Sequence, residues 1–302
     1  MGTPAFAVPV LEMLLHSDHS LVAVVTQPDR PKGRGLVLEA SPVKQAAQEH
    51  GIEVLQPEQM SEPAFLARLQ SLRPDLIVTA AFGHILKQEI LSLPRRGCIN
   101  VHASLLPKYR GAAPIAWAIA RGETETGVTV IQMDEGMDRG PVLMQKSIAI
   151  APDETGGSLH DKLAALGAEV LSETLSALAA GSLQPIPQDH AQASSAPLLK
   201  KADGRLDWGK SAVELERRIR AFDPWPGGFF TWQDQPIKVW KAKAVSGHSK
   251  PGEIIAANQD GLVVACGEGA LQIHELQPPG KRRMGATDFL RGHQVLAGTL
   301  LF

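Results

Sequence analysis

Two polar side chains stand close together at the end of an apolar stretch of the sequence. Asn100 follows the apolar residues Cys98 and Ile99, and only Val101 separates it from His102. In a β-strand, residues two apart point to the same face, and open α/β sheets bind ligands at the carboxyl ends of their strands. An Asn-x-His pair alone more often caps a turn. Here a loop with turn residues and two cations, residues 104–114, follows at once, which favours a ligand site.

A carboxylate follows the next apolar run, residues 128–133. Asp138 lies in a Gly-containing turn after that run, and we expect it to face the same sheet edge as Asn100 and His102. The alternative is that Asp138 only shapes the turn by bonding its own backbone, as Asp often does.

Two segments together, residues 97–107 and 137–140, closely resemble the folate-dependent formyltransferases. The resemblance implies that Asn100, His102 and Asp138 are catalytic and that 10-formyltetrahydrofolate is the formyl donor, a cosubstrate. It also implies that two segments hold the pterin ring of the folate. The matching residues here are Phe82, Gly83, His84, Ile85, Leu86, Ser104, Leu105, Leu106 and Pro107. Core packing is the alternative for Ile85 and Leu86.

The three residue types suit formyl transfer to an amine. Attack on the formyl carbon creates an oxyanion, while the attacking nitrogen becomes cationic and the leaving nitrogen needs a proton. The Asn100 amide can donate to the oxyanion, His102 can add a second donor, and Asp138 can hold His102 charged and relay protons. This chemistry requires no metal.

Three further segments bear on the acceptor of the formyl group. Residues 27–35 resemble the loop that methionyl-tRNA formyltransferases insert into the acceptor arm, with Lys32 and Arg34 as cations, although a solvated loop is the alternative. Residues 280–293 resemble the end of the same enzymes. They carry three adjacent cations for phosphate: Lys281, Arg282 and Arg283. Residues 204–228 resemble the entry to the C-terminal domain of the same enzymes. They discriminate poorly between the possible acceptors, because a sugar-nucleotide formyltransferase carries a similar segment.

The resemblance therefore implies transfer of the formyl group to initiator methionyl-tRNA, for translation initiation. A formyltransferase that acts on an amino-sugar nucleotide is the first alternative. A second alternative is a non-catalytic scaffold that binds folate or RNA, and the presence of all three catalytic residue types argues against it.

The elements around these residues predict an α/β fold. Short β-branched runs alternate with helical patterns up to about residue 180, which indicates a doubly wound, mostly parallel, Rossmann-like sheet. Pro-rich residues 182–203 are typical of a linker. One helix and several short alternating runs follow and predict a small OB-like β-barrel. We therefore expect a catalytic domain at 1–181, a linker at 182–203 and a tRNA-binding domain at 204–302.

Composition agrees with a soluble two-domain enzyme. The chain has 302 residues, 44% of them hydrophobic and 21% charged, and no apolar run long enough to cross a membrane. From Lys200 onward, 15 Lys and Arg stand against 11 Asp and Glu, so the C-terminal part is the better candidate for a polyanion. Cys98 and Cys266 are isolated and predict buried thiols, and the start of the chain lacks a secretory signal. We expect a cytoplasmic monomer without a metal.

The start of the chain carries one more expectation. Relatives place an apolar β-strand ahead of the segment that matches Met1 to Pro4. We therefore expect either that the reading frame begins upstream or that the sheet has an open slot beside residues 21–26.

Overall fold

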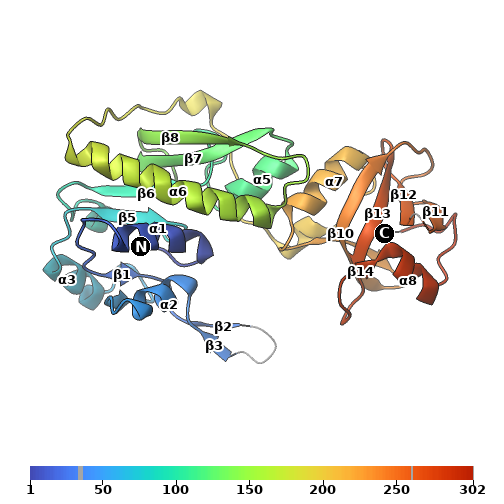
Figure 1. Cartoon of the computed structure of the whole chain (residues 1–302), viewed down its shortest axis with the longest axis horizontal. Coiled ribbons are helices and arrows are strands. Elements are labelled where there is room, and N and C mark those ends of the chain that lie inside the picture. Colours follow the sequence, from blue (N-terminus) through green and yellow to red (C-terminus); the bar gives the residue numbers. More distant parts are fainter. Residues whose placement is uncertain (33–36, 260, 302) are drawn as a thin grey trace. The chain divides into compact units, whose positions relative to one another are not determined.

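The chain forms two compact units in a computed structural model that describes every residue except 33–36, 260 and 302. Unit 1 consists of three segments, Met1–Pro114, Glu125–Ala149 and His160–Pro197. Unit 2 consists of the remaining segments, Ile115–Thr124, Ile150–Leu159 and Leu198–Phe302. Each unit has its own sheet (Figure 1).

The sheet of unit 1 is mixed. Four strands follow one another in the order β5 (Ile77–Ala80), β6 (Cys98–His102), β7 (Glu125–Gln132) and β8 (Val142–Ala149). The β5–β6 pair is parallel, but β6–β7 and β7–β8 are antiparallel. A separate parallel pair joins β1 (Val24–Val25) and β4 (Val54–Leu55). The predicted mostly parallel sheet is therefore wrong for β7 and β8, because a short turn rather than a crossover helix connects them.

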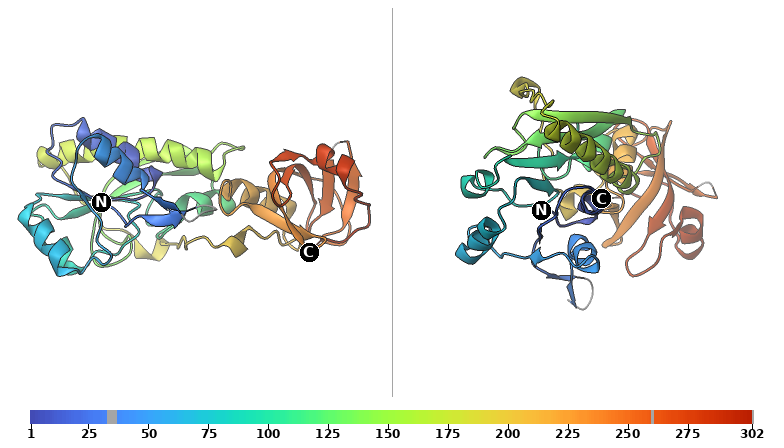
Figure 2. Two further views of the ribbon diagram at one scale, coloured as in Figure 1. Left: turned by 90° about the horizontal axis from the view of Figure 1, so that it is seen from below. Right: turned by 60° about the vertical axis from the view of Figure 1, so that its left-hand side comes forward.

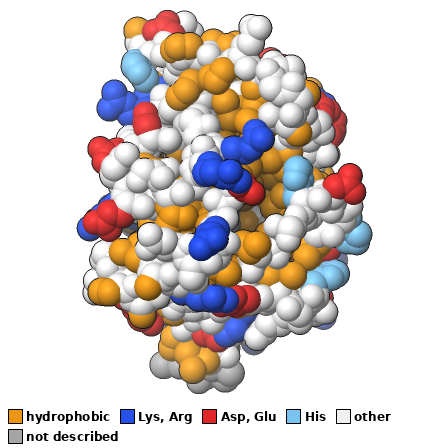
Figure 3. Space-filling view, turned by 90° about the vertical axis from the view of Figure 1, so that its left-hand side faces the viewer, with side chains coloured by type: hydrophobic (Ala, Val, Ile, Leu, Met, Phe, Trp, Pro, Cys, Tyr) orange, Lys and Arg blue, Asp and Glu red, His pale blue; other side chains and the backbone are white. Residues whose placement is uncertain are grey.

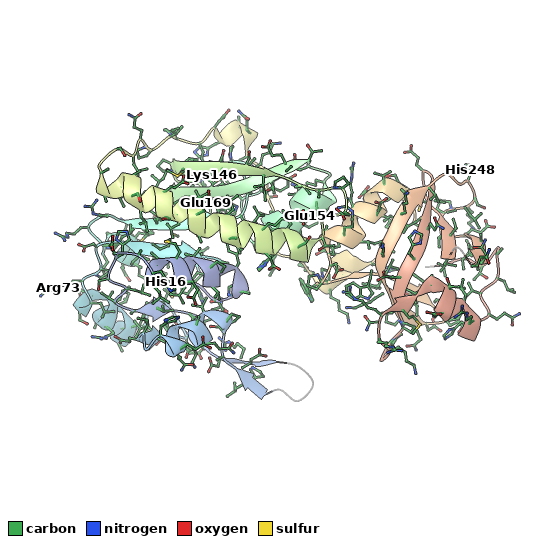
Figure 4. All side chains as sticks on the ribbon, viewed as in Figure 1. His16, Arg73, Lys146, Glu154, Glu169 and His248 are labelled. Carbon is green, nitrogen blue, oxygen red and sulfur yellow. The ribbon has the colours of Figure 1, made fainter. Side chains whose placement is uncertain are left out.

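Unit 1 contains α1 (Val8–Leu15), α2 (Pro42–Glu49), α3 (Pro63–Ser71), the short α4 (Gln88–Leu91) and most of α6 (Gly156–Ala179). Nearly all of α5 (Pro114–Ala120) belongs to unit 2. α2 begins with Pro42 after Ser41, whose hydroxyl accepts from the Lys44 amide, as a helix N-terminus favours. α6 is tied to β8 by an ion pair of 2.8 Å between Lys146 and Glu169 (Figure 4).

The described part of the predicted finger at residues 27–35 includes a short strand. β2 (Arg30–Lys32) pairs antiparallel with β3 (Val37–Glu39), and the hairpin projects away from the sheet of unit 1 (Figure 2). Lys32 lies at the end of β2, while Arg34 is outside the described residues.

The sheet of unit 1 has a gap between β1 and β5. The first two residues bridge it: the Ala80 amide donates to the Met1 carbonyl, and the Gly2 amide donates to the Val25 carbonyl, both at 3.0 Å. Beside Met1 the structure contains a cavity of about 410 Å³, lined on one side by residues 19–23 and on the other by residues 72–78.

The residues that line this cavity are mostly apolar. Arg73, at its rim, lies at the left-hand end of unit 1 (Figure 4). The space-filling view of that end shows hydrophobic side chains gathered beside Lys and Arg side chains (Figure 3). The Met1 ammonium group donates to the Val78 carbonyl at 2.6 Å, and burial lowers the pKa of this amine to about 5.

The described residues of unit 2 form one antiparallel sheet and the helices α5, α7 (Ala212–Ala221) and α8 (Ala286–Gly292), together with the start of α6. Its strands, in spatial order, are β11 (Ile254–Asn258), β12 (Gly261–Ala265), β13 (Ala270–Gln277), β10 (Gln235–Val245) and β9 (Gly228–Trp232), with β14 (Met284–Gly285) beside β13. The pairings among described residues leave β11 and β9 at the two ends. They establish an antiparallel sheet without closing it into a barrel.

Candidate active site

Three predicted side chains meet at the end of β6. Asn100 and His102 come from β6, and Asp138 comes from the turn between β7 and β8. The Asn100 Nδ2 atom donates to Asp138 Oδ1 at 3.3 Å, and His102 Nδ1 lies 3.6 Å from Asp138 Oδ2. The His102 side chain is 6% exposed and that of Asp138 is 14% exposed. The structure thus brings an amide, an imidazole and a carboxylate together in a site largely shielded from water.

The carboxylate of Asp138 is fixed from a second side. The Gly111 amide donates to Asp138 Oδ2 at 2.8 Å. Gly111 has φ +116°, and a Cβ there would lie 2.8 Å from the Ala196 carbonyl oxygen, so this position requires glycine. Asp138 itself has φ +53°, an uncommon conformation for a residue with a side chain. The alternative reading, in which Asp138 only forms its own turn, does not account for these contacts with other segments.

Thr79 fixes the orientation of the Asn100 amide. Its hydroxyl donates to Asn100 Oδ1 at 2.7 Å, and the side chain of Thr79 is buried. Because Oδ1 is the acceptor of this bond, the Asn100 nitrogen faces Asp138, and its second N–H can donate to a bound substrate. Thr79 lies on β5, and its sequence surroundings gave no sign of this role.

The bonding of His102 determines which ring nitrogen carries a proton. His102 Nε2 lies 2.9 Å from the Tyr109 carbonyl oxygen. A carbonyl only accepts, so Nε2 carries hydrogen. In the neutral ring, Nδ1 therefore has a free electron pair, and in the charged ring it carries a proton next to Asp138. His102 can thus gain or lose a proton at Nδ1 without losing its anchor.

The loop Ser104–Pro107 is held from β7 and β8. The Leu106 amide donates to Thr129 Oγ1 at 3.1 Å, while the Thr129 hydroxyl donates to the Ser104 carbonyl at 2.6 Å. Gln145 donates to the Leu106 carbonyl at 3.0 Å. Ser104 and Leu106 are buried, whereas Leu105 and Pro107 are partly exposed. The predicted folate loop therefore lies directly beside the three polar side chains and has a fixed backbone.

The segment Phe82–Leu86 divides between core and surface. Phe82 and Leu86 are 4% and 2% exposed and belong to a hydrophobic cluster behind the sheet. Ile85 is 67% exposed, Gly83 is exposed, and His84 is partly exposed. Core packing, the alternative for Ile85 and Leu86, therefore applies to Leu86 and not to Ile85.

Comparison with known proteins decides the family. A family model described as formyl transferase matches residues 1–175, and one described as formyl transferase, C-terminal domain, matches residues 198–294. The chain belongs to the formyl transferase family.

The most similar relatives include a methionyl-tRNA formyltransferase from Myxococcus xanthus. It is 53% identical over 302 residues, which is 100% of this chain and 96% of the relative. Among solved structures, the sugar 3N-formyl transferase WlaRD, with dTDP and 5-N-formyl-THF, has a TM-score of 0.68 at 18% identity, over 93% of this chain and 97% of that one. HypX from Aquifex aeolicus, in complex with tetrahydrofolic acid, has a TM-score of 0.58 at 21% identity, over 80% of this chain and 43% of that one.

The C-terminal cations of this formyltransferase differ in their surroundings. Arg283 forms an ion pair of 2.9 Å with Asp223, and its guanidinium carbon lies 3.6 Å from the ring centre of Trp240. Lys281 and Arg282 are exposed and make no ion pair with another described residue. Sequence spacing placed the three cations together but could not predict that Asp223, sixty positions earlier, holds one of them.

Other groups in the formyltransferase set limits on its chemistry. Cys98 and Cys266 are buried free thiols, as predicted, and burial raises the pKa of Cys98 to about 12 and that of Cys266 to about 11. Neither is suited to act as a nucleophile at neutral pH. Within the described part of the chain, no three His, Cys, Asp or Glu side chains are placed to hold a metal ion. Nor is any helix there long and apolar enough to span a membrane.

Proposed function

We propose that this enzyme transfers the formyl group of 10-formyltetrahydrofolate to the amino group of initiator methionyl-tRNA. The observation that carries the proposal is the meeting of Asn100, His102 and Asp138 at one strand end, in a chain half identical over its full length to methionyl-tRNA formyltransferases. Folate is supported by the family and by a tetrahydrofolate complex of the same fold.

In this proposal each group has one task, which the geometry supports. The amine nitrogen attacks the formyl carbon, and the carbonyl electron pair moves onto oxygen, where the free N–H of Asn100 can donate. His102 Nδ1 can take the proton that the attacking nitrogen must lose, and Asp138 stabilises the resulting imidazolium. The oxyanion then re-forms the carbonyl, and the bond between the formyl carbon and the folate nitrogen breaks. The electron pair of that bond goes to the folate nitrogen, which takes a proton from His102.

In this proposal the folate lies beside Asn100, His102 and Asp138, against two segments of unit 1. Ser104 to Pro107 would offer a rigid backbone, and Gly83, His84 and Ile85 would offer the surface part of the other segment. Phe82 and Leu86 act indirectly, because their side chains belong to the core. No metal takes part in this mechanism.

The acceptor tRNA would contact unit 2 and the β2–β3 hairpin. We assign phosphate contacts to Lys281 and Arg282, which are exposed, and the hairpin cations Lys32 and Arg34 to the acceptor end. Arg283 would help mainly by stabilising the surface beside Trp240. The division into a catalytic domain 1–181, a linker 182–203 and an OB-like tRNA-binding domain 204–302 belongs to the same proposal, as does action as a monomer in the cytoplasm.

An acceptor assay tests the proposal against its alternative. The enzyme is given 10-formyltetrahydrofolate with charged initiator tRNA and, separately, with an amino-sugar nucleotide, and the formylated products are separated by mass. We expect formylmethionyl-tRNA and no formylated sugar. Formylation of the sugar nucleotide alone would reject methionyl-tRNA as the acceptor and favour the alternative. The likeness to a sugar formyltransferase, at 18% identity, supports a shared fold and not a shared acceptor.

A further inference from the structure

Part of the segment expected to be a linker crosses the catalytic edge of unit 1. Ile186 and Val142 exchange two backbone hydrogen bonds of 2.8 Å. Farther along, the Arg110 amide donates to the Ser194 carbonyl at 2.8 Å, and the Ala196 amide donates to the Arg110 carbonyl at 2.7 Å. We call residues 186–196 the strap. It is anchored at one end to Val142, the first residue of β8, and at the other end to Arg110, in the loop that follows β6.

Gln188 is a buried polar residue of the strap, with only 8% of its surface exposed. Its Nε2 atom donates to the carbonyl oxygens of Asp138 at 2.9 Å and Gly140 at 2.7 Å. Its Oε1 atom accepts from Arg110, at 2.6 Å from Nη2 and 3.2 Å from Nε. Both N–H groups and the carbonyl oxygen of this one side chain are therefore used.

These partners require an amide. The two carbonyl oxygens only accept, and the guanidinium only donates, so the residue between them must supply two N–H donors and an oxygen acceptor at once. An ionised Glu would keep the bonds to Arg110 but would place a charge against two carbonyl oxygens. A Leu would remove all of these bonds and would leave Arg110 with its contact to His190, 2.9 Å from Nη2.

The bonds of Gln188 bear directly on Asp138. This residue has φ +53°, a left-handed backbone that is strained at a non-glycine residue and persists only where neighbours fix it. Gln188 binds the carbonyl of Asp138 and that of Gly140, so it fixes the backbone of the turn that carries the carboxylate. Arg110, its other partner, directly precedes Gly111, whose amide binds that carboxylate.

We propose that Gln188 is a positioning residue for formyl transfer, holding the turn Asp138–Gly140 and Arg110 so that the Asp138 carboxylate faces Asn100 and His102. The inference rests on the proposed function for the reaction. Gln188 acts through Asp138 and touches no substrate.

Two variants test this inference, Gln188→Leu and the size-matched Gln188→Glu, with Gln184→Leu as a control at an exposed position just outside the strap. Because a misplacement near 1 Å can cost about 100-fold in rate, we expect kcat to fall about 10-fold to 100-fold in both variants. KM for folate and tRNA should stay near the wild-type value. The Gln184→Leu variant should match the wild type.

A double-mutant cycle separates positioning from a general loss of structure. If Gln188 acts through Asp138, the variant Asp138→Ala with Gln188→Leu should be no slower than Asp138→Ala alone. A second full loss of rate in the double variant would overturn the inference. So would wild-type kcat in folded Gln188→Leu and Gln188→Glu.

Hydrogen exchange gives a readout that does not depend on activity. Peptides that contain residues 134–141 should exchange faster in both Gln188 variants, while peptides from α7 in unit 2 should not change. Unchanged exchange at 134–141 would overturn the inference even if the enzyme's acceptor were misassigned. Failure of the wild type to formylate methionyl-tRNA would instead reject the proposed function.

Discussion

The candidate active site and the C-terminal cations both consist of polar side chains, but these side chains are held in different ways. Asn100, His102 and Asp138 are largely buried, and each is fixed by partners from other segments. Lys281 and Arg282 are exposed and form no ion pair among the described residues. The difference indicates that the first region orients reacting groups, whereas the second attracts a charged partner over a distance. Changes in the first should alter rate, and changes in the second should alter affinity and its dependence on salt.

Removal of the His102 imidazole should give the largest loss of kcat, and so the clearest difference between the two regions. The variant His102→Ala loses the group that moves protons, so we expect kcat to fall by about 10²–10⁴-fold, the usual contribution of general acid–base catalysis. The measurement is steady-state formylation with both substrates saturating. His248→Ala, an exposed histidine of unit 2, is the control (Figure 4). A folded His102→Ala variant with wild-type kcat would remove His102 from the mechanism.

A smaller loss of rate should follow from Thr79→Val. Valine keeps the shape but not the hydroxyl that orients Asn100. A net hydrogen bond is worth about 1 kcal/mol, so we expect kcat to fall roughly fivefold to tenfold. Thr174→Val, which removes a buried hydroxyl of α6 away from the site, should leave kcat unchanged. Equal kcat in the two valine variants would show that Asn100 does not need Thr79.

In the exposed region, Lys281→Ala combined with Arg282→Ala should raise KM for tRNA and leave kcat and the KM for folate unchanged. For every cation that no longer meets a phosphate, the slope of log affinity against log salt should become shallower by about 0.7–0.9. Binding is measured at several salt concentrations, with Lys250→Ala as an exposed control. A full salt slope in the double variant would place the tRNA elsewhere.

The smallest effect on activity is expected when the Met1 amine, at the gap between β1 and β5, is titrated. This titration should change the stability of the protein and not its rate. Burial lowers the pKa of the Met1 amine to about 5, below its ordinary value of 8.0, so between these pH values the unfolded chain binds more protons than the folded chain. The free energy of unfolding should therefore rise as pH increases from about 5 to about 8.

Extension at Met1 by five β-branched apolar residues tests the same gap. It removes this amine and offers strand partners beside residues 21–23. We expect a higher Tm, by about 2–4 °C for each kcal/mol gained, and a weaker dependence on pH. A matched extension of Gly and Ser residues should remove the amine without raising Tm as far. Equal Tm in all three proteins would show that the gap does not accept a strand.

The sequence predicts the parts of the site that lie close together along the chain. Asn100 and His102 are two residues apart in a strand, and Asp138 follows the next strand, so alternation and strand order suffice to place them. Thr79, Thr129 and Gln188 reach the site from other segments, and their types are common in strands and loops. No local pattern distinguishes them from other polar residues.

The same limit applies to the fold. The features that form β6 and α7 are local: an apolar run for β6, and for α7 a cap in which Ser211 accepts from the Glu214 amide. Residues 21–23 line a cavity and belong to no strand, which depends on segments far away along the chain. The antiparallel direction of β7 depends on its partners and not on its own residues. The strap was expected to be part of a linker because Pro185 and Pro187 interrupt periodicity, although its backbone is bonded to unit 1.

The central claim is that the amide of Asn100 stabilises the oxyanion formed when an amine attacks the formyl group. Its most direct test is the single-turnover rate of formyl transfer to methionyl-tRNA by the wild type and by Asn100→Ala, with the enzyme in excess and both substrates bound. We expect Asn100→Ala to transfer about 10²–10³-fold more slowly, the usual cost of one missing oxyanion donor, with equal affinity for tRNA and folate. A folded Asn100→Ala variant that transfers at the wild-type rate would contradict the account.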